Sequence, residues 1–120
     1  MKWQPKVCLV TACVLWIGFI GQAVEPAAIG PPLTTFLKQH CYDCHGSDLQ
    51  EAELNIESLP RELIDPDVME RWVKIFDKVT AGEMPPQDET QPGEKDALSF
   101  NEKLSGTLHD ASLARQQREG

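Results

Sequence analysis

The chain has 120 residues, of which 41% are hydrophobic and 25% are charged, and this composition is typical of one small globular domain. It carries 19 acidic and 11 basic side chains, which give a formal net charge of −8 at pH 7. Such an acidic surface disfavours binding to nucleic acid or to anionic lipid, and it favours a partner whose docking face is basic or neutral.

The first 23 residues have the pattern of a secretory signal peptide. Lys2 and Lys6 give a positive start, residues 7–20 form an apolar run, and Gly21-Gln22-Ala23 provides small residues for cleavage. The alternative is an uncleaved membrane anchor, for which this apolar run is short. Cleavage predicts an exported mature domain without a membrane segment, in the periplasm or an equivalent compartment outside the cytoplasm.

A linker and a first helix are expected next. Residues 24–31 are rich in Pro, Ala and Gly and predict a linker, after which Pro32 can occupy the first turn of a helix. One apolar face of that helix is formed by Leu33, Phe36, Leu37 and Cys41. Gly46 is expected to end the helix.

The sequence Cys41-Tyr42-Asp43-Cys44-His45 carries the most specific chemical signal of the chain. C-x-x-C-H is the attachment sequence of c-type haem, in which the two thiols add to the haem vinyl groups and the histidine binds the iron. Two alternatives are weaker. A redox disulfide favours a thioredoxin-like context, and a zinc site needs a second pair of Cys or His ligands, and neither is found nearby.

The middle of the chain predicts a short extended segment and a second helix. Residues 54–56 alternate between apolar and polar side chains, as in a strand laid over an apolar surface. Asp65 as N-cap and Pro66 at the first helical position predict a helix that ends at Gly82. Its apolar stripe consists of Val68, Trp72, Ile75, Phe76 and Val79.

A loop and a closing helix complete the predicted elements. Met84 is followed by Pro85 and Pro86, whose fixed φ angles stiffen the loop. A thioether sulfur is a soft, neutral ligand that suits iron cycling between two oxidation states. Pro92 is expected to open the last helix, whose core-facing side is predicted to hold Ala97, Leu98, Asn101, Leu104, Leu108 and Ala111.

The order of these elements resembles that of small class I cytochromes c. In particular, C-x-x-C-H together with Gly82-Glu83-Met84-Pro85-Pro86 is similar to the planctomycete-type cytochrome c domain. The resemblance implies an all-α fold of about three main helices around one covalent haem c, with Met84 as the distal ligand opposite His45. It places the domain at residues 32–115. Because such domains stand at the N-terminus of longer exported proteins, residues 116–120 are expected to begin a C-terminal continuation.

Several other side chains have weaker assignments. We expect Met69 to lie in the core and His40 to lie at the surface, whereas His109 would bind iron only if Met84 were displaced. Trp72 and Arg61 are candidates for binding a haem propionate. By similarity to other cytochromes, the Pro60 carbonyl is the candidate acceptor for the second ring nitrogen of His45.

These assignments predict one-electron transfer by a haem that is bound through Cys41 and Cys44 and ligated by His45 and Met84. Because both axial positions are filled, the domain is not expected to be an enzyme. The alternative function is a haem-based enzyme or small-ligand sensor in which Met84 is displaceable. The expected partner is a redox protein with a basic or neutral docking face.

Signal cleavage after Ala23 can be tested directly. N-terminal sequencing of the exported protein should begin at Val24, because the small residues that a signal peptidase reads end at Ala23. A mature chain that begins at Met1 would instead indicate an anchor, and a lipidated Cys13 would indicate a lipoprotein.

Overall fold

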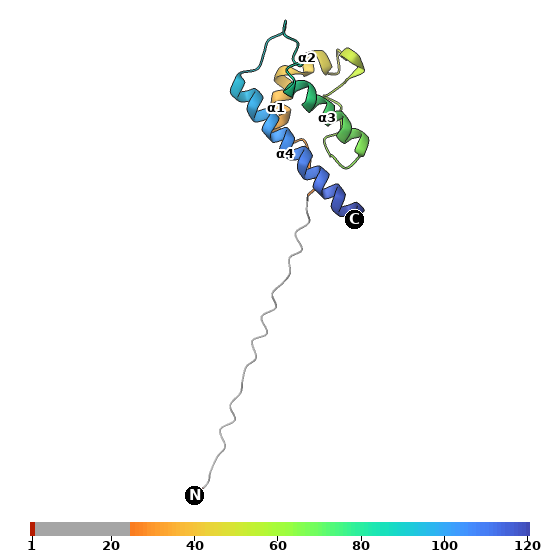
Figure 1. Cartoon of the computed structure of the whole chain (residues 1–120), viewed down its shortest axis with the longest axis vertical. Coiled ribbons are helices and arrows are strands. Elements are labelled where there is room, and N and C mark those ends of the chain that lie inside the picture. The colour runs from red at the N-terminus through yellow and green to blue at the C-terminus, as the bar shows by residue number, and fades with distance from the viewer. Residues whose placement is uncertain (2–24) are drawn as a thin grey trace.

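The computed structural model describes Met1 and residues 25–120, and this part of the chain is helical without β-strands (Figure 1). It contains four α-helices and one short 3-10 helix, namely α1 (Pro31–His40), α2 (Tyr42–His45), η1 (Glu51–Glu53), α3 (Pro66–Thr80) and α4 (Glu94–Glu119). The all-α prediction is confirmed, and α1, α3 and α4 are the three main helices. The predicted signal peptide lies outside the described residues.

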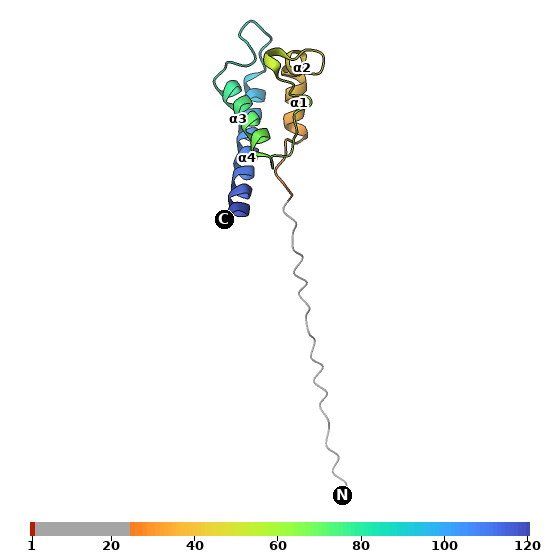
Figure 2. The ribbon, with the colours of Figure 1, turned by 90° about the vertical axis from the view of Figure 1, so that its right-hand side faces the viewer.

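Helix α4 is the central element, because it contacts both α1 and α3 (Figures 1 and 2). The predicted apolar face of α1 is confirmed, since Leu33, Phe36 and Leu37 are all buried. The Phe36 ring stacks on the ring of Phe100 from α4, with centroids 4.1 Å apart and planes inclined by 18°. Burial of two aromatic side chains, together with this offset contact, ties the first helix to the last.

Helix α3 begins where the sequence predicts. Asp65 caps it, because one carboxylate oxygen accepts a hydrogen bond of 2.8 Å from the Asp67 backbone N–H, and Pro66 occupies the first helical position. Trp72 and Ile75 are buried at 1% and 7% exposure. The rest of the predicted stripe packs partly buried against the core, and it consists of Val68, Phe76 and Val79.

The end of α3 is also the predicted one. Gly82 has φ of +72°, a left-handed conformation that glycine adopts at little cost. The Glu83 N–H donates to the Lys78 carbonyl at 3.0 Å, and the Gly82 N–H donates to the Val79 carbonyl at 3.1 Å. These two bonds form a Schellman motif, which satisfies the last carbonyls of the helix and turns the chain toward Met84.

Helix α4 differs from its prediction in start and in face. It begins at Glu94 after Gly93, not at Pro92, and its buried residues are Phe100, Leu104, Leu108 and Ala111. Leu98 is 55% exposed, so its predicted place in the core is wrong. Phe100 precedes Leu104 by about one turn and shares its face, whereas Leu98 precedes Leu104 by six residues and points to another side.

Irregular segments close the core beside the helices. The Ile29 N–H donates to the Arg61 carbonyl at 2.9 Å, and the Leu63 N–H donates to the Ala27 carbonyl at 3.1 Å. Ile29 and Leu63 are only 2% and 3% exposed. Residues 27–29, which the composition assigns to a linker, therefore pack as part of the fold.

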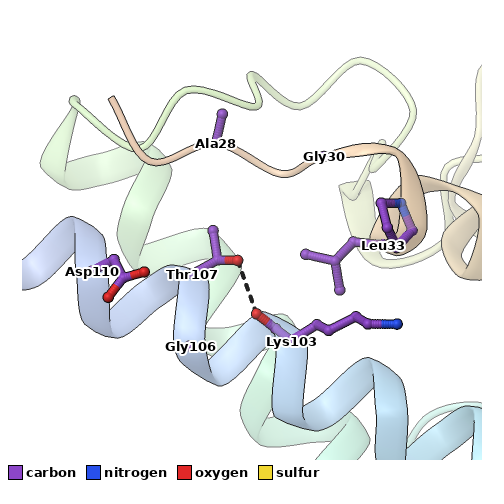
Figure 3. Close-up of a pocket in the computed structure, with 8 residues that line it drawn as sticks. Ala28, Gly30, Leu33, Lys103, Gly106, Thr107 and Asp110 are labelled. Atoms are coloured by element: carbon purple, nitrogen blue, oxygen red, sulfur yellow. Dashed lines mark hydrogen bonds between the residues drawn. The ribbon is translucent and has the colours of Figure 1, made fainter. Parts of the chain in front are cut away.

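The segment from Ala28 to Gly30 also borders a groove of about 350 Å³ against α4 (Figure 3). On the α4 side of this groove, the Thr107 hydroxyl donates to the Lys103 carbonyl at 2.8 Å. The residues of the C-x-x-C-H motif and Met84 do not line it.

None of the helices within residues 25–120 has the length and apolarity that crossing a bilayer requires.

Substitution by alanine should have opposite effects on stability at Gly82 and at Gly106. Gly82→Ala should lower the free energy of unfolding of the haem-loaded protein by about 1–2 kcal/mol, because Gly82 has φ of +72°. Gly106→Ala should raise it by about 0.5–1 kcal/mol, because Gly106 lies inside α4 and a Cβ there would have no atom within 4 Å. Urea denaturation followed by circular dichroism measures both, and a stabilising Gly82→Ala would contradict the assigned cap.

Candidate functional site

The C-x-x-C-H motif forms a tight turn of its own at the end of α1. The predicted continuous helix is interrupted at Cys41, whose φ and ψ of −127° and −35° separate α1 from α2. The Cys41 carbonyl then accepts hydrogen bonds from the N–H groups of Cys44, at 3.3 Å, and His45, at 2.9 Å. Residues three apart on such a turn share a face, so the spacing presents both thiols on one side. Cys41 and Cys44 are both free cysteines.

Gly46 ends this turn, as predicted, and it does so for a steric reason. A Cβ at Gly46 would lie 2.3 Å from the Tyr42 carbonyl oxygen, closer than two such atoms approach in proteins. Gly46 is buried, and its φ of −107° would be open to any residue. The glycine is therefore required by the close approach of the two backbone segments.

His45 is held through both its backbone groups and its ring. Its N–H donates to Cys41, and its carbonyl accepts a hydrogen bond of 2.7 Å from the Ile56 N–H. Its Nδ1 lies 3.0 Å from the Glu51 carbonyl oxygen. Because a carbonyl can only accept, Nδ1 carries the hydrogen, and Nε2 keeps a lone pair that can bind a metal.

The acceptor for the ring is therefore Glu51, and the candidate named from the sequence, Pro60, is wrong. The Pro60 carbonyl instead accepts a hydrogen bond of 2.8 Å from the Trp72 indole N–H. This bond ties α3 to the segment that follows Ile56. It also occupies the indole hydrogen that was a candidate for a propionate.

The loop from Ser47 to Glu57 carries the Glu51 carbonyl. Both the N–H and the hydroxyl of Ser47 donate to one Glu57 carboxylate oxygen, at 3.0 and 2.6 Å, and so join the two ends of the loop. These bonds lower the pKa of Glu57. The stability that these bonds add to the folded state is therefore fully present above pH 4.5, the usual pKa of a glutamate. It is lost as the pH falls through the lowered pKa of Glu57.

The turn after Glu51 is strained. Ala52 and Glu53 have φ angles of +55° and +59°, in the left-handed region that residues with a Cβ seldom adopt. Such conformations cost about 1–2 kcal/mol per residue. Strain of this kind persists where the surrounding structure requires it, and here it directly follows the carbonyl that orients His45.

Met84 belongs to the loop between α3 and α4. Figure 2 shows this loop at the same end of the helices as α2. Its side chain is 37% exposed, so it does not pack in the core, whereas Met69 packs partly buried against the core as predicted. The same loop carries Glu89, whose negative charge acts on the Cys44 thiol. The loop and the C-x-x-C-H turn therefore lie within electrostatic reach of each other.

The two thiols have raised pKa values. Burial, and next the charge of Cys44, raise the pKa of Cys41 to about 12. The pKa of Cys44 is raised by desolvation and then by the carboxylates of Glu51, Glu89 and Asp43. Redox-active C-x-x-C pairs instead have a lowered thiol pKa, so this environment opposes thiol–disulfide exchange as the function.

The remaining residues singled out in the sequence have other contacts. The His40 ring packs 4.7 Å from the Phe36 ring, and His109 is exposed on α4. Arg61 donates to the Tyr42 hydroxyl at 3.3 Å. Among residues 25–120 there is no group of three or more His, Cys, Asp or Glu side chains suited to a metal ion.

Sequence reasoning missed groups that carry no side-chain signal or no periodic pattern. The Glu51 carbonyl is a backbone group, and only the fold reveals that it faces His45. Asn101 is correctly predicted as core-facing on α4, but the sequence does not show that its buried side-chain oxygen has no hydrogen-bond partner in the described part of the chain. Such a group costs about 1–3 kcal/mol unless something satisfies it.

Comparison with known proteins agrees with this geometry. Residues 41–88 match the family model described as planctomycete cytochrome C. The matched segment runs from the first cysteine of C-x-x-C-H to just beyond the Met-Pro-Pro loop, so the resemblance predicted from these two motifs is confirmed. Cytochrome c domains carry covalent haem c and transfer electrons. No curated protein and no solved structure gives a significant match.

The residues present suit a covalently bound haem. Two unpaired thiols share one helical turn, and the neighbouring imidazole has its Nδ1 satisfied by a carbonyl, which leaves Nε2 available. A thioether that the core does not bury lies in a loop at the same end of the helices. These are the donor types that hold and ligate iron in cytochromes c.

The steric role of Gly46 can be tested with a matched substitution. Gly46→Ala should lower the free energy of unfolding of the haem-loaded protein by about 1–3 kcal/mol, because its Cβ would meet the Tyr42 carbonyl oxygen at 2.3 Å. Gly106→Ala is the control, since a Cβ there meets nothing within 4 Å. Thermal unfolding measures both, and equal stability of the Gly46 variant and the parent would show that the turn is not closely packed.

Proposed function

We propose that this chain is a one-electron carrier with a single haem c attached through Cys41 and Cys44 and ligated by His45 and Met84. The observation that carries the proposal is the hydrogen bond between His45 Nδ1 and the Glu51 carbonyl, on a turn that also presents two unpaired thiols. That arrangement suits the binding of a metal ion through His45 Nε2, next to a haem that is anchored covalently by the two thiols. The family match at residues 41–88 supports the same assignment.

The residues divide the work. Cys41 and Cys44 anchor the cofactor, and the Glu51 carbonyl fixes the orientation and the tautomer of His45. Met84 supplies a soft, neutral second ligand from a loop stiffened by two prolines. When bound, the haem supplies an iron that accepts and returns one electron. With both axial positions taken there is no position for a substrate, so the domain is proposed not to be an enzyme.

A second candidate is a haem-based enzyme or small-ligand sensor in which Met84 leaves the iron. The exposure of Met84, at 37%, is the observation that favours it, because no core packing would have to be broken. Against it stand two hydrogen bonds that fasten the loop on either side of this residue, from the Met84 N–H to the Lys78 carbonyl and from the Gln91 amide to the Pro86 carbonyl. A carrier therefore remains the proposal that the structure supports best.

We also propose export and a partner of defined charge. The pattern of residues 1–23 supports export to the periplasm or an equivalent compartment. After desolvation, the negative charges of Glu51, Glu89 and Asp43 raise the pKa of the Cys44 thiol. A redox partner with a basic or neutral face is best matched to carboxylates at that place.

Covalent attachment should depend on both cysteines. A Cys41→Ala/Cys44→Ala variant, made in a host with cytochrome c maturation machinery, should be colourless and unstable, because neither thiol remains to bind a vinyl group. The parent should gain the mass of one haem and give a pyridine haemochrome spectrum of c type. A parent without covalent haem would refute the proposed function as a whole.

Met84 should be the second iron ligand. The ferric parent should show the weak near-infrared band of sulfur-ligated haem, and Met84→Ala should lose it while keeping the covalent haem. The ferrous parent should respond little to carbon monoxide, whereas the variant should bind it. Met69→Leu is the matched control on α3, and retention of the band in Met84→Ala would exclude Met84. Strong carbon monoxide binding by the parent would instead favour the enzyme or sensor.

A further inference from the structure

The position of Met84 is set by its backbone and not by packing of its side chain. The side chain is 37% exposed, so the core places little restraint on it. The two prolines that follow Met84 lack N–H groups and cannot tie the loop through backbone donors of their own. What holds the loop must therefore come from the residues on either side.

The N-terminal side is fastened to α3. The Met84 N–H donates to the Lys78 carbonyl at 3.2 Å, alongside the Schellman bond from Glu83. The Gln87 side-chain amide donates to the Gly82 carbonyl at 3.0 Å, and Lys78 forms an ion pair with Glu83. Four contacts thus converge on the turn that precedes Met84.

The C-terminal side is fastened by one backbone bond, from the Glu89 N–H to the Pro86 carbonyl at 3.0 Å, and by one side chain, that of Gln91. The Gln91 amide nitrogen lies 2.7 Å from the Pro86 carbonyl oxygen, 3.1 Å from that of Glu89 and 3.3 Å from that of Pro85. The amide has two hydrogens, so one is shared between two acceptors. Gln91 therefore folds the end of the loop back onto both prolines that follow Met84.

We propose that Gln91 is a positioning residue, whose amide holds the residue 84–91 loop in the conformation that presents the Met84 sulfur as an iron ligand. The inference rests on the proposed function and adds to it the group that keeps the ligand in place. The Lys78 carbonyl fixes where the loop starts, and Gln91 fixes how it returns. Without Gln91, the Pro85 and Pro86 carbonyls lose their side-chain donor and the loop gains conformational freedom.

This role has a measurable consequence in the binding of an external ligand. Imidazole can bind ferric iron only in the fraction of molecules in which Met84 has left, so its apparent Kd is the intrinsic Kd divided by that fraction. Removing the Gln91 donor should raise the open fraction roughly tenfold, as expected for the net loss of one or two hydrogen bonds. The apparent Kd for imidazole should then fall about tenfold.

The experiment titrates the ferric, haem-loaded protein with imidazole and follows the shift of the haem Soret band in every variant. In the proteins that show the near-infrared sulfur–iron band, its loss is followed as well. Gln91→Glu removes the donor at nearly constant size, and Gln91→Ala removes it without adding charge. Gln117→Glu on the exposed end of α4 is the control matched for charge. Met84→Ala gives the intrinsic affinity of the fully open site. Circular dichroism confirms that each variant keeps its helices.

The expected result is that both Gln91 variants bind imidazole about tenfold more tightly than the parent, while Gln117→Glu binds it as the parent does. If the parent shows the band and both Gln91 variants match it in imidazole affinity, the inference on Gln91 is overturned and the proposed function stands. If the parent lacks the band and already binds imidazole as tightly as Met84→Ala, Met84 ligation fails and the inference fails with it.

Discussion

The site depends on how a helix of only four residues is held in place. Such a short helix is not stable by itself, because nucleation costs more than its few hydrogen bonds return. α2 is held instead by His45, whose carbonyl receives the Ile56 N–H and whose ring binds the Glu51 carbonyl. Ile56 is buried at 4% exposure, and the segment after it is bonded to Trp72 through Pro60. The orientation of one imidazole thus rests on the core of α3.

The long helices and the iron-binding residue types could be predicted from the sequence, because each has a local signal. Asp65-Pro66 and Gly82 mark helix ends by capping chemistry alone, and the spacing of Cys41, Cys44 and His45 is specific by itself. Helical spacing places Phe100, and not Leu98, on the same face as Leu104, and the stacking of Phe100 on Phe36 shows that this face is the buried one. Tertiary contacts settle which face of a helix is inside.

The site geometry was less predictable because it is made by groups that sequence patterns do not reveal. Glu51 orients His45 through a main-chain carbonyl that any residue could provide. Pro60 has the same kind of carbonyl and was the expected acceptor, yet it binds the Trp72 indole. Gln91 reads as an ordinary residue of a polar linker until its amide is found against the carbonyls of Pro85 and Pro86. Contacts of this kind fix the loops, and no sequence pattern reveals them even where the partners are near in sequence.

The left-handed conformation of Ala52 and Glu53 lowers the stability of the fold at the turn that orients the His45 ring. A glycine at either position would relax the turn, yet it would also widen the range of directions open to the preceding carbonyl. Laboratory evolution for heat resistance would thus find stabilising glycine substitutions at these two positions. Variants selected in that way would be more stable, but the Glu51 carbonyl would hold the His45 ring less firmly. Selection for redox activity would be needed to remove them.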